Sequence, residues 1–107
     1  MKYRVELTRD AESDLNRLAG YIATHQSIKQ ATYVVAQLET VTKKLATFPE
    51  RGVFPPELVA LGIREYRQVF FKPYRIVYRI LGNRVLVLLI ADARQDMVAL
   101  LAERLLK

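Results

Sequence analysis

The sequence lacks cysteine and tryptophan altogether and has a single histidine, His25. Without cysteine the chain can form neither a disulfide nor a thiolate metal site. One histidine and carboxylates without ligand spacing supply no metal-binding motif. No stretch approaches the roughly 18 apolar residues of a membrane helix, and the N-terminus lacks the apolar run of a signal sequence. We therefore expect no metal, no cofactor, no membrane partner and a cytoplasmic location.

Acidic residues are scarce in the second half of the chain. The 17 Lys/Arg and 11 Asp/Glu give a net charge of +6, and residues 62–107 hold 9 of the basic residues but only 4 of the acidic ones. A basic surface of this kind suits a polyanion or an acidic partner chain. The length of 107 residues, 51% of them hydrophobic, predicts one folded domain spanning residues 1–107.

The first half of the chain has the pattern of one strand and two helices. Residues 2–7 alternate between polar and apolar, which is typical of a half-buried strand. Apolar residues at helical spacing predict a helix from residue 9 to about 24, with Thr8 as its cap. Ser27 and Gln30 form a capping box that begins a second helix, with an apolar stripe that runs to Phe48 and stops at Pro49. The short link between the helices predicts an antiparallel hairpin.

The second half has the pattern of a sheet followed by a helix. Residues 49–62, rich in Pro and Gly, predict one long loop. Strands follow near 63–71, 73–81 and 84 to about 92, with Gly82-Asn83 as a hairpin turn. The last strand is apolar on both faces and should be central, and Asp96 can cap a final helix. The order β-α-α-β-β-β-α predicts an α+β fold, with a mostly antiparallel sheet packed against an N-terminal helical hairpin.

Residues 64–79 combine basic and aromatic side chains. Such a mixture suits a polyanion or an acidic chain, but Arg and Tyr are also ordinary solvent-facing residues of a half-exposed sheet. Tyr74 and Tyr78 share the parity of neighbouring isoleucines, which indicates core residues with a solvated hydroxyl. The basic members are Arg64, Arg67, Lys72, Arg75 and Arg79, and the aromatic members are Tyr66, Phe70, Phe71, Tyr74 and Tyr78.

Several local motifs, in this order and spacing, resemble the ParE/RelE superfamily, the toxins of bacterial type II toxin–antitoxin systems. The resemblance covers nearly the whole chain. The motifs are Ala11-x-x-Asp14-Leu15, Leu45-x-x-Phe48-Pro49-x-x-Gly52, Gly62-Ile63-Arg64, Tyr74-Arg75-Ile76-Val77-Tyr78-Arg79-Ile80 and Val87-x-Leu89-Ile90-Ala91-x-x-Arg94-x-Asp96.

The resemblance implies a plasmid-stabilisation type of toxin that arrests growth. ParE-like members poison DNA gyrase, whereas RelE-like members cut mRNA in the ribosomal A site. Both kinds are neutralised by a cognate antitoxin, ParD-like or similar, whose C-terminal segment folds on binding. Residual apolar surface between the two N-terminal helices would form the antitoxin groove.

An mRNA-cleaving member needs a base, an acid and cations for the developing phosphorane charge. His25 lies on the wrong element, and the residues after the last strand contain neither His nor Tyr. Tyrosines would have to act as the base although their ordinary pKa lies near 10. The candidate nuclease set is Arg64, Arg75, Tyr78 and Arg94, with Tyr66, Tyr74 or Asp92 as further proton-transfer groups and Lys72 as an acid.

The lack of obvious proton-transfer groups favours the gyrase hypothesis, because a gyrase poison needs a docking surface rather than catalysis of its own. The residues predicted to bind the target or the antitoxin are Arg64, Arg67, Lys72, Arg75 and Arg94. Two alternatives stay open at this point. One is a ribosome-dependent mRNA endoribonuclease of the RelE type, and the other is a binding module of the same fold without activity.

Overall fold

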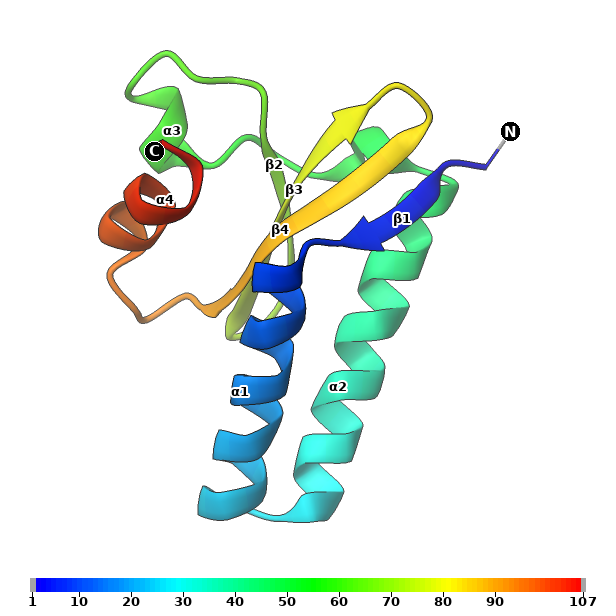
Figure 1. Cartoon of the computed structure of the whole chain (residues 1–107), viewed down its shortest axis with the longest axis vertical. Helices are drawn as coiled ribbons and strands as arrows, with labels where there is room; N and C mark the ends of the chain where they lie inside the picture. Colours follow the sequence, from blue (N-terminus) through cyan, green and yellow to red (C-terminus); the bar gives the residue numbers. More distant parts are fainter. Residues whose placement is uncertain (1, 107) are drawn as a thin grey trace.

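The computed structural model describes residues 2–106, so that Met1 and Lys107, the ends of the predicted domain, lie outside the described residues. The element order confirms the predicted α+β fold, with one additional short helix, α3 (Figure 1). The elements are β1 (Arg4–Leu7), α1 (Arg9–His25), α2 (Ile28–Lys43), α3 (Pro56–Val59), β2 (Arg67–Phe71), β3 (Tyr74–Leu81), β4 (Arg84–Asp92) and α4 (Met97–Leu105).

The four strands form one sheet in the order β1-β4-β3-β2. The pairs β2–β3 and β3–β4 are antiparallel hairpins, while β1 lies parallel to β4. The predicted Gly82-Asn83 turn is confirmed, because Leu81 pairs with Arg84 on either side of it. The strand predicted to be central, β4, lies between β1 and β3, and its apolar side chains are covered on both faces of the sheet.

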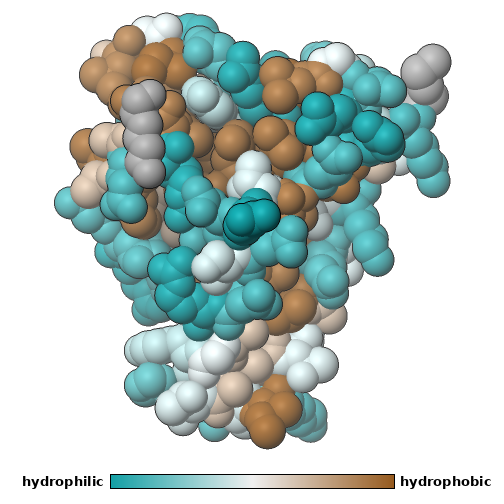
Figure 2. All heavy atoms as spheres, in the orientation of Figure 1, coloured by the Kyte–Doolittle hydropathy of each residue, from teal (hydrophilic) through white to brown (hydrophobic). Residues whose placement is uncertain are grey.

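Each face of the sheet has its own core. The α1–α2 hairpin covers one face and extends past the end of the sheet (Figure 1). The short helices α3 and α4 cover the opposite face. Apolar residues also reach the surface over α3 and α4, at the upper left of Figure 2. The first core includes Ile22, Leu38, Leu45, Ile76 and Val87, and the second includes Leu58, Val77, Leu89, Met97 and Leu101.

The three predicted helix caps are confirmed. The hydroxyl of Thr8 accepts a hydrogen bond from the Ala11 N–H at 3.1 Å, and that of Ser27 accepts one from the Gln30 N–H at 2.9 Å. The carboxylate of Asp96 accepts one from the Ala99 N–H at 3.1 Å. Each cap satisfies an N–H group that has no partner inside its helix. Within residues 2–106, no helix is long and apolar enough to cross a membrane.

The segment between α2 and β2 differs from the prediction. The predicted loop 49–62 contains a 3₁₀ turn, Pro49–Arg51, and the helix α3. The strand predicted from residue 63 begins only at Arg67, because Ile63 turns in to pack beside Leu58 of α3. Phe48, predicted to continue the apolar stripe of α2, is 64% exposed. The α-helix ends at Lys43, so helical periodicity no longer places Phe48 on the core face.

The Phe48-Pro49-x-x-Gly52 motif surrounds the hydroxyl of Tyr78. This hydroxyl donates to the Pro49 carbonyl and accepts from the Gly52 N–H at 3.0 Å. A Cβ atom at Gly52 would lie 2.5 Å from the same oxygen, so the close approach requires glycine. Tyr78 is the core residue that the strand parity predicts. Its hydroxyl, however, is bonded to backbone rather than solvated.

A buried carboxylate, Asp14, connects α1 to β4 and α4. It makes a two-pronged ion pair with Arg104 at 2.9 and 3.0 Å and accepts a hydrogen bond from the Ile90 N–H at 3.0 Å. Arg104 also donates to the Leu88 carbonyl at 2.8 Å. Leu88 is the extra residue of a β-bulge, since Val77 pairs with Leu89 and Tyr78 with Val87. The ion pair therefore satisfies backbone groups of β4 beyond the end of β1.

A second ion pair holds α3 against the sheet. The guanidinium of Arg75 on β3 makes two hydrogen bonds of 2.8 Å to the Glu57 carboxylate on α3. Its Nε donates to the Gln68 side chain on β2 at 2.7 Å. These hydrogen bonds from Arg75 hold the pKa of Glu57 below its ordinary value. Arg75 is therefore a buried structural residue, and the prediction that it lies on an exposed binding surface is wrong.

We expect Asp14→Asn to lower the free energy of unfolding by about 3 kcal/mol or more, because it removes the buried counter-ion of the largely buried Arg104. Equilibrium urea unfolding followed by circular dichroism measures the change. The control is Asp10→Asn, since Asp10 is exposed and 3.8 Å from Arg104. It should change stability by at most about 0.5 kcal/mol. Equal stabilities of both variants would contradict the role assigned to Asp14.

We expect Glu57→Gln to lower the free energy of unfolding by about 2 kcal/mol at pH 7, because the Arg75 guanidinium loses a charged acceptor. The pKa of Glu57 is lowered on folding, so its contribution is present above the ordinary glutamate pKa and disappears as the pH falls through the folded value. The difference from wild type should therefore shrink in acid. Glu39→Gln, on the exposed face of α2, is the control and should show neither effect.

Candidate functional site

The predicted site residues do not form one site but lie in separate parts of the structure. Arg67 pairs with Tyr78 near one end of β3, whereas Arg94 follows Asp92, which pairs with Tyr74 at the other end. Four residues of strand separate the two positions, which is about 13 Å. Lys72 lies exposed in the β2–β3 turn. Because Arg75 is buried, Arg64 and Arg67 are the only residues of the predicted binding surface that lie close together.

Two arginines lie against one aromatic ring at the start of β2. The guanidinium carbons of Arg64 and Arg67 are 5.8 and 4.6 Å from the ring centroid of Phe54. At the same end of the sheet, Arg79 lies 5.7 Å from the ring centroid of Tyr66, on the face that α3 and α4 cover, whereas Arg67 lies beside Tyr78 on the α1–α2 face. Each contact is a cation–π interaction worth about 0.5–1 kcal/mol at an exposed site. The rings therefore hold the three guanidinium groups in place without cancelling their charge.

A fourth arginine, Arg51, joins this group. Arg67 donates to the backbone carbonyls of Glu50 and Gly52 at 3.2 and 3.0 Å, on either side of Arg51. The charges of Arg51 and Arg67 both act on the hydroxyl of Tyr78. We call Arg51, Arg64, Arg67 and Arg79, together with Phe54 and Tyr66, the arginine cluster.

The arginine cluster is not neutralised by acidic side chains. Within residues 2–106, none of its four guanidinium groups lies within 4.0 Å of a carboxylate, and Glu50 and Glu65 in the same segments leave a surplus of positive charge. Of the other arginines, only Arg9 shares this property among the described residues. The remaining ones, Arg4, Arg17, Arg75, Arg84, Arg94 and Arg104, all form ion pairs.

The tyrosines proposed as nuclease bases are poorly suited to that role. Burial raises the pKa of Tyr78, and both hydrogen bonds of its hydroxyl go to backbone. Burial, and secondarily the charge of Asp92, raises the pKa of Tyr74. A base at pH 7 would need the opposite shift. His25 stacks on Tyr21 at 4.0 Å at the end of α1, away from the arginine cluster, as expected of a helix-end residue.

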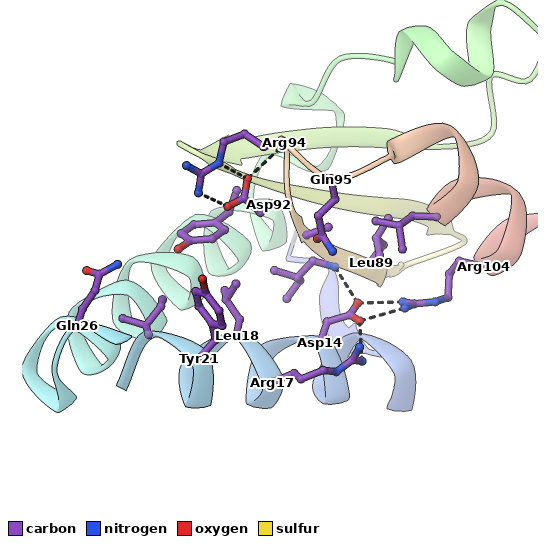
Figure 3. A pocket seen from close by; sticks show the side chains of 15 residues that line it. Asp14, Arg17, Leu18, Tyr21, Gln26, Leu89, Asp92, Arg94, Gln95 and Arg104 are labelled. Carbon is purple, nitrogen blue, oxygen red and sulfur yellow. Dashed lines mark hydrogen bonds and ion pairs between the residues drawn. The ribbon is translucent and has the colours of Figure 1, made fainter. Parts of the chain in front are cut away.

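A groove of about 450 Å³ lies between α1, the end of β4 and α4 (Figure 3). Its floor is apolar and includes Leu18 and Leu89, while Arg17, Tyr21 and Arg94 stand at its polar rim. The Asp14–Arg104 ion pair closes one end of it. None of the lining residues belongs to α2. This groove is therefore a different surface from the one predicted between the two N-terminal helices, which stays a prediction.

Arg94 is fixed at the groove rim by Asp92. Its Nε and its backbone N–H each donate to the Asp92 carboxylate at 2.9 Å, and a further bond from Nη2 completes the pair. The Arg94 side chain lowers the pKa of Asp92, and Asp92 in turn raises the pKa of Arg94. Asp92 therefore stays ionised near neutral pH and is a poor proton donor. Arg94 itself is exposed and keeps free N–H groups for a ligand.

Sequence reasoning missed most of the residues that organise these two regions. Asp14 carried a readable signal, because a carboxylate stands among the apolar residues of the α1 stripe, three residues after Ala11 and four before Leu18. Its partner Arg104 is ninety positions away in the sequence, so no local pattern indicates that the two residues pair. Phe54 gave none either, since its role depends on Arg64 and Arg67, which lie ten and thirteen positions further along the chain.

Known proteins resemble this chain over most of its length. Residues 5–97 match the model of the family described as ParE toxin of type II toxin-antitoxin system, parDE. Toxin ParE3 of Caulobacter vibrioides is 30% identical over 101 residues, which cover 94% of this chain and 97% of that protein.

Two solved structures share the fold. A chain of the chromosomal ParDE toxin–antitoxin system of P. aeruginosa aligns with a TM-score of 0.71 and 18% identity, over 85% of this chain and 96% of that one. A chain of the RelBE2 toxin–antitoxin complex of Mycobacterium tuberculosis aligns with a TM-score of 0.63 and 20% identity, over 86% and 99%. Together with the family match and Toxin ParE3, these findings show that the chain belongs to the ParE toxin family of type II toxin–antitoxin systems.

Proposed function

We propose that this toxin acts by poisoning DNA gyrase and that a cognate antitoxin neutralises it. The proposal extends the family assignment to a target and a partner. The observation that carries it is the arginine cluster, which offers several positive charges without a carboxylate partner but no histidine. A surface of this composition can dock onto a gyrase–DNA complex, whereas cleavage of RNA would also require groups that transfer protons.

The raised pKa values of Tyr74 and Tyr78 support the gyrase target over ribosomal mRNA. Of the three candidate tyrosine bases, Tyr66 and Tyr78 stand beside the arginine cluster, but the hydroxyl of Tyr78 is bonded to backbone groups, whereas the ring of Tyr66 faces Arg79. A RelE-like nuclease mechanism would therefore depend on Tyr66, and Tyr66→Phe would abolish it.

The groove along α1 is the surface that we assign to the antitoxin. Both solved structures described above belong to toxin–antitoxin systems, which supports an antitoxin partner for this chain. An apolar floor between α1 and β4, with a polar rim, suits an amphipathic segment that folds on binding. The exposed Tyr21 and the fixed Arg94 are the residue types that most often dominate such interfaces.

We expect the purified toxin to inhibit DNA supercoiling by gyrase and to increase the amount of cleaved DNA in the presence of ATP. An agarose-gel supercoiling and cleavage assay measures both effects. The same protein, mixed beforehand with its antitoxin, is the control and should have neither effect. If folded toxin leaves gyrase unaffected and instead cleaves mRNA in a translating extract, the gyrase target is wrong.

We expect Tyr21→Ala to weaken antitoxin binding at least about tenfold, since an exposed interface tyrosine commonly contributes more than about 1 kcal/mol. Isothermal titration calorimetry with the purified antitoxin measures the affinity. Tyr33→Ala is a matched control, because Tyr33 has a similar exposure of 52%, against 61% for Tyr21, but lies on α2 outside the groove. A larger loss with Tyr33→Ala would move the antitoxin site to α2.

A further inference from the structure

We propose that the arginine cluster binds the phosphodiester backbone of duplex DNA directly, so that the toxin contacts DNA as well as gyrase. The choice of duplex DNA over other polyanions rests on the proposed gyrase target. The contact itself is inferred from the geometry and charge of the cluster and is testable without gyrase.

The arginines fall into two groups, those that form ion pairs with carboxylates and those that do not. Three of the ion-paired arginines connect elements of the fold: Arg75 joins β3 to α3, Arg84 joins β4 to β1, and Arg104 joins α4 to α1. In contrast, the Arg64 and Arg79 side chains make no hydrogen bond among the described residues. Gathering unpaired like charges destabilises a folded protein at low salt. The unpaired charges of the cluster are therefore explained by binding of an anionic ligand and not by stabilisation of the fold.

The aromatic rings hold these arginines in an orientation that suits phosphate binding. A ring covers the flat face of a guanidinium, whereas its N–H donors lie in the plane and remain available. Phe54 holds Arg64 and Arg67 in this way, and Tyr66 holds Arg79. Because the side chains are already ordered, less rotamer entropy is lost when they bind. Planar N–H pairs match the two oxygens of a phosphate group.

The cluster is suited to backbone contact rather than to reading bases. It lies at one end of the sheet, at the beginning of β2, on the neighbouring part of β3 and in the adjoining loop, without a long helix that could enter the major groove. Binding should therefore be independent of DNA sequence and strongly dependent on salt. Four phosphate contacts would give a slope of log K against log salt of about −3.6 for duplex DNA.

Fluorescence anisotropy with a labelled 20-base-pair DNA duplex, between 50 and 200 mM NaCl, tests the proposal. We expect the double variant Arg64→Ala/Arg79→Ala to bind at least about tenfold more weakly at 50 mM, with a slope shallower by about 2. Arg67 is left unchanged because it also supports the backbone around Gly52. The double variant Arg64→Lys/Arg79→Lys, which keeps both charges, should retain most of the slope.

The matched control is Arg9→Ala/Lys29→Ala, which removes two exposed, unpaired charges outside the cluster, at the starts of α1 and α2. It should bind like wild type. Three results would overturn the proposal: no binding of wild type at 50 mM, an equal loss in the control, or tighter binding to a single-stranded RNA of the same length. A parallel gyrase assay keeps the two proposals apart, since gyrase inhibition without DNA binding would refute only this one.

Discussion

The arrangement of the whole molecule depends on one buried carboxylate, Asp14 of α1. Its ion pair with Arg104 brings the last helix back to the first, and together the two side chains bond the Leu88 carbonyl and the Ile90 N–H beyond the end of β1. A charge buried this deeply is favourable only with its partner in place. The same pair forms one end of the groove along α1, so the interaction that stabilises the fold also shapes the proposed antitoxin surface (Figure 3).

The role of each arginine follows from the groups that its side chain contacts. Where a carboxylate is near, as for Arg75 with Glu57 or Arg94 with Asp92, the guanidinium is fixed and its charge is locally balanced. In the arginine cluster the partners are aromatic rings and backbone carbonyls, which orient a cation but leave its charge intact. The positive field of the molecule should therefore be strongest around the start of β2, and electrostatic attraction of an anionic target would begin there.

Much of the fold was predictable because local patterns determine it. Hydrophobic periodicity and capping residues such as Thr8, Ser27 and Asp96 gave the helices, and the fully apolar β4 was correctly placed inside the sheet. The candidate site was less predictable, because alternation along a strand cannot show whether an arginine meets solvent or a distant acid. Arg75 was misplaced for this reason, since its partner Glu57 lies on a helix within a predicted loop. The resemblance to a toxin family indicated the kind of protein, but the separation of Arg94 from Arg64 and Arg67 required coordinates.

The central claim is that the arginine cluster forms the working surface of the toxin. Growth after expression without antitoxin tests this most directly, with Arg64→Ala/Arg79→Ala compared with Arg9→Ala/Lys29→Ala at equal amounts of folded protein. We expect the first variant to permit growth and the second to arrest it as wild type does, although both lose the same charge. Growth arrest by both variants would contradict the claim and would place the working surface elsewhere on the molecule.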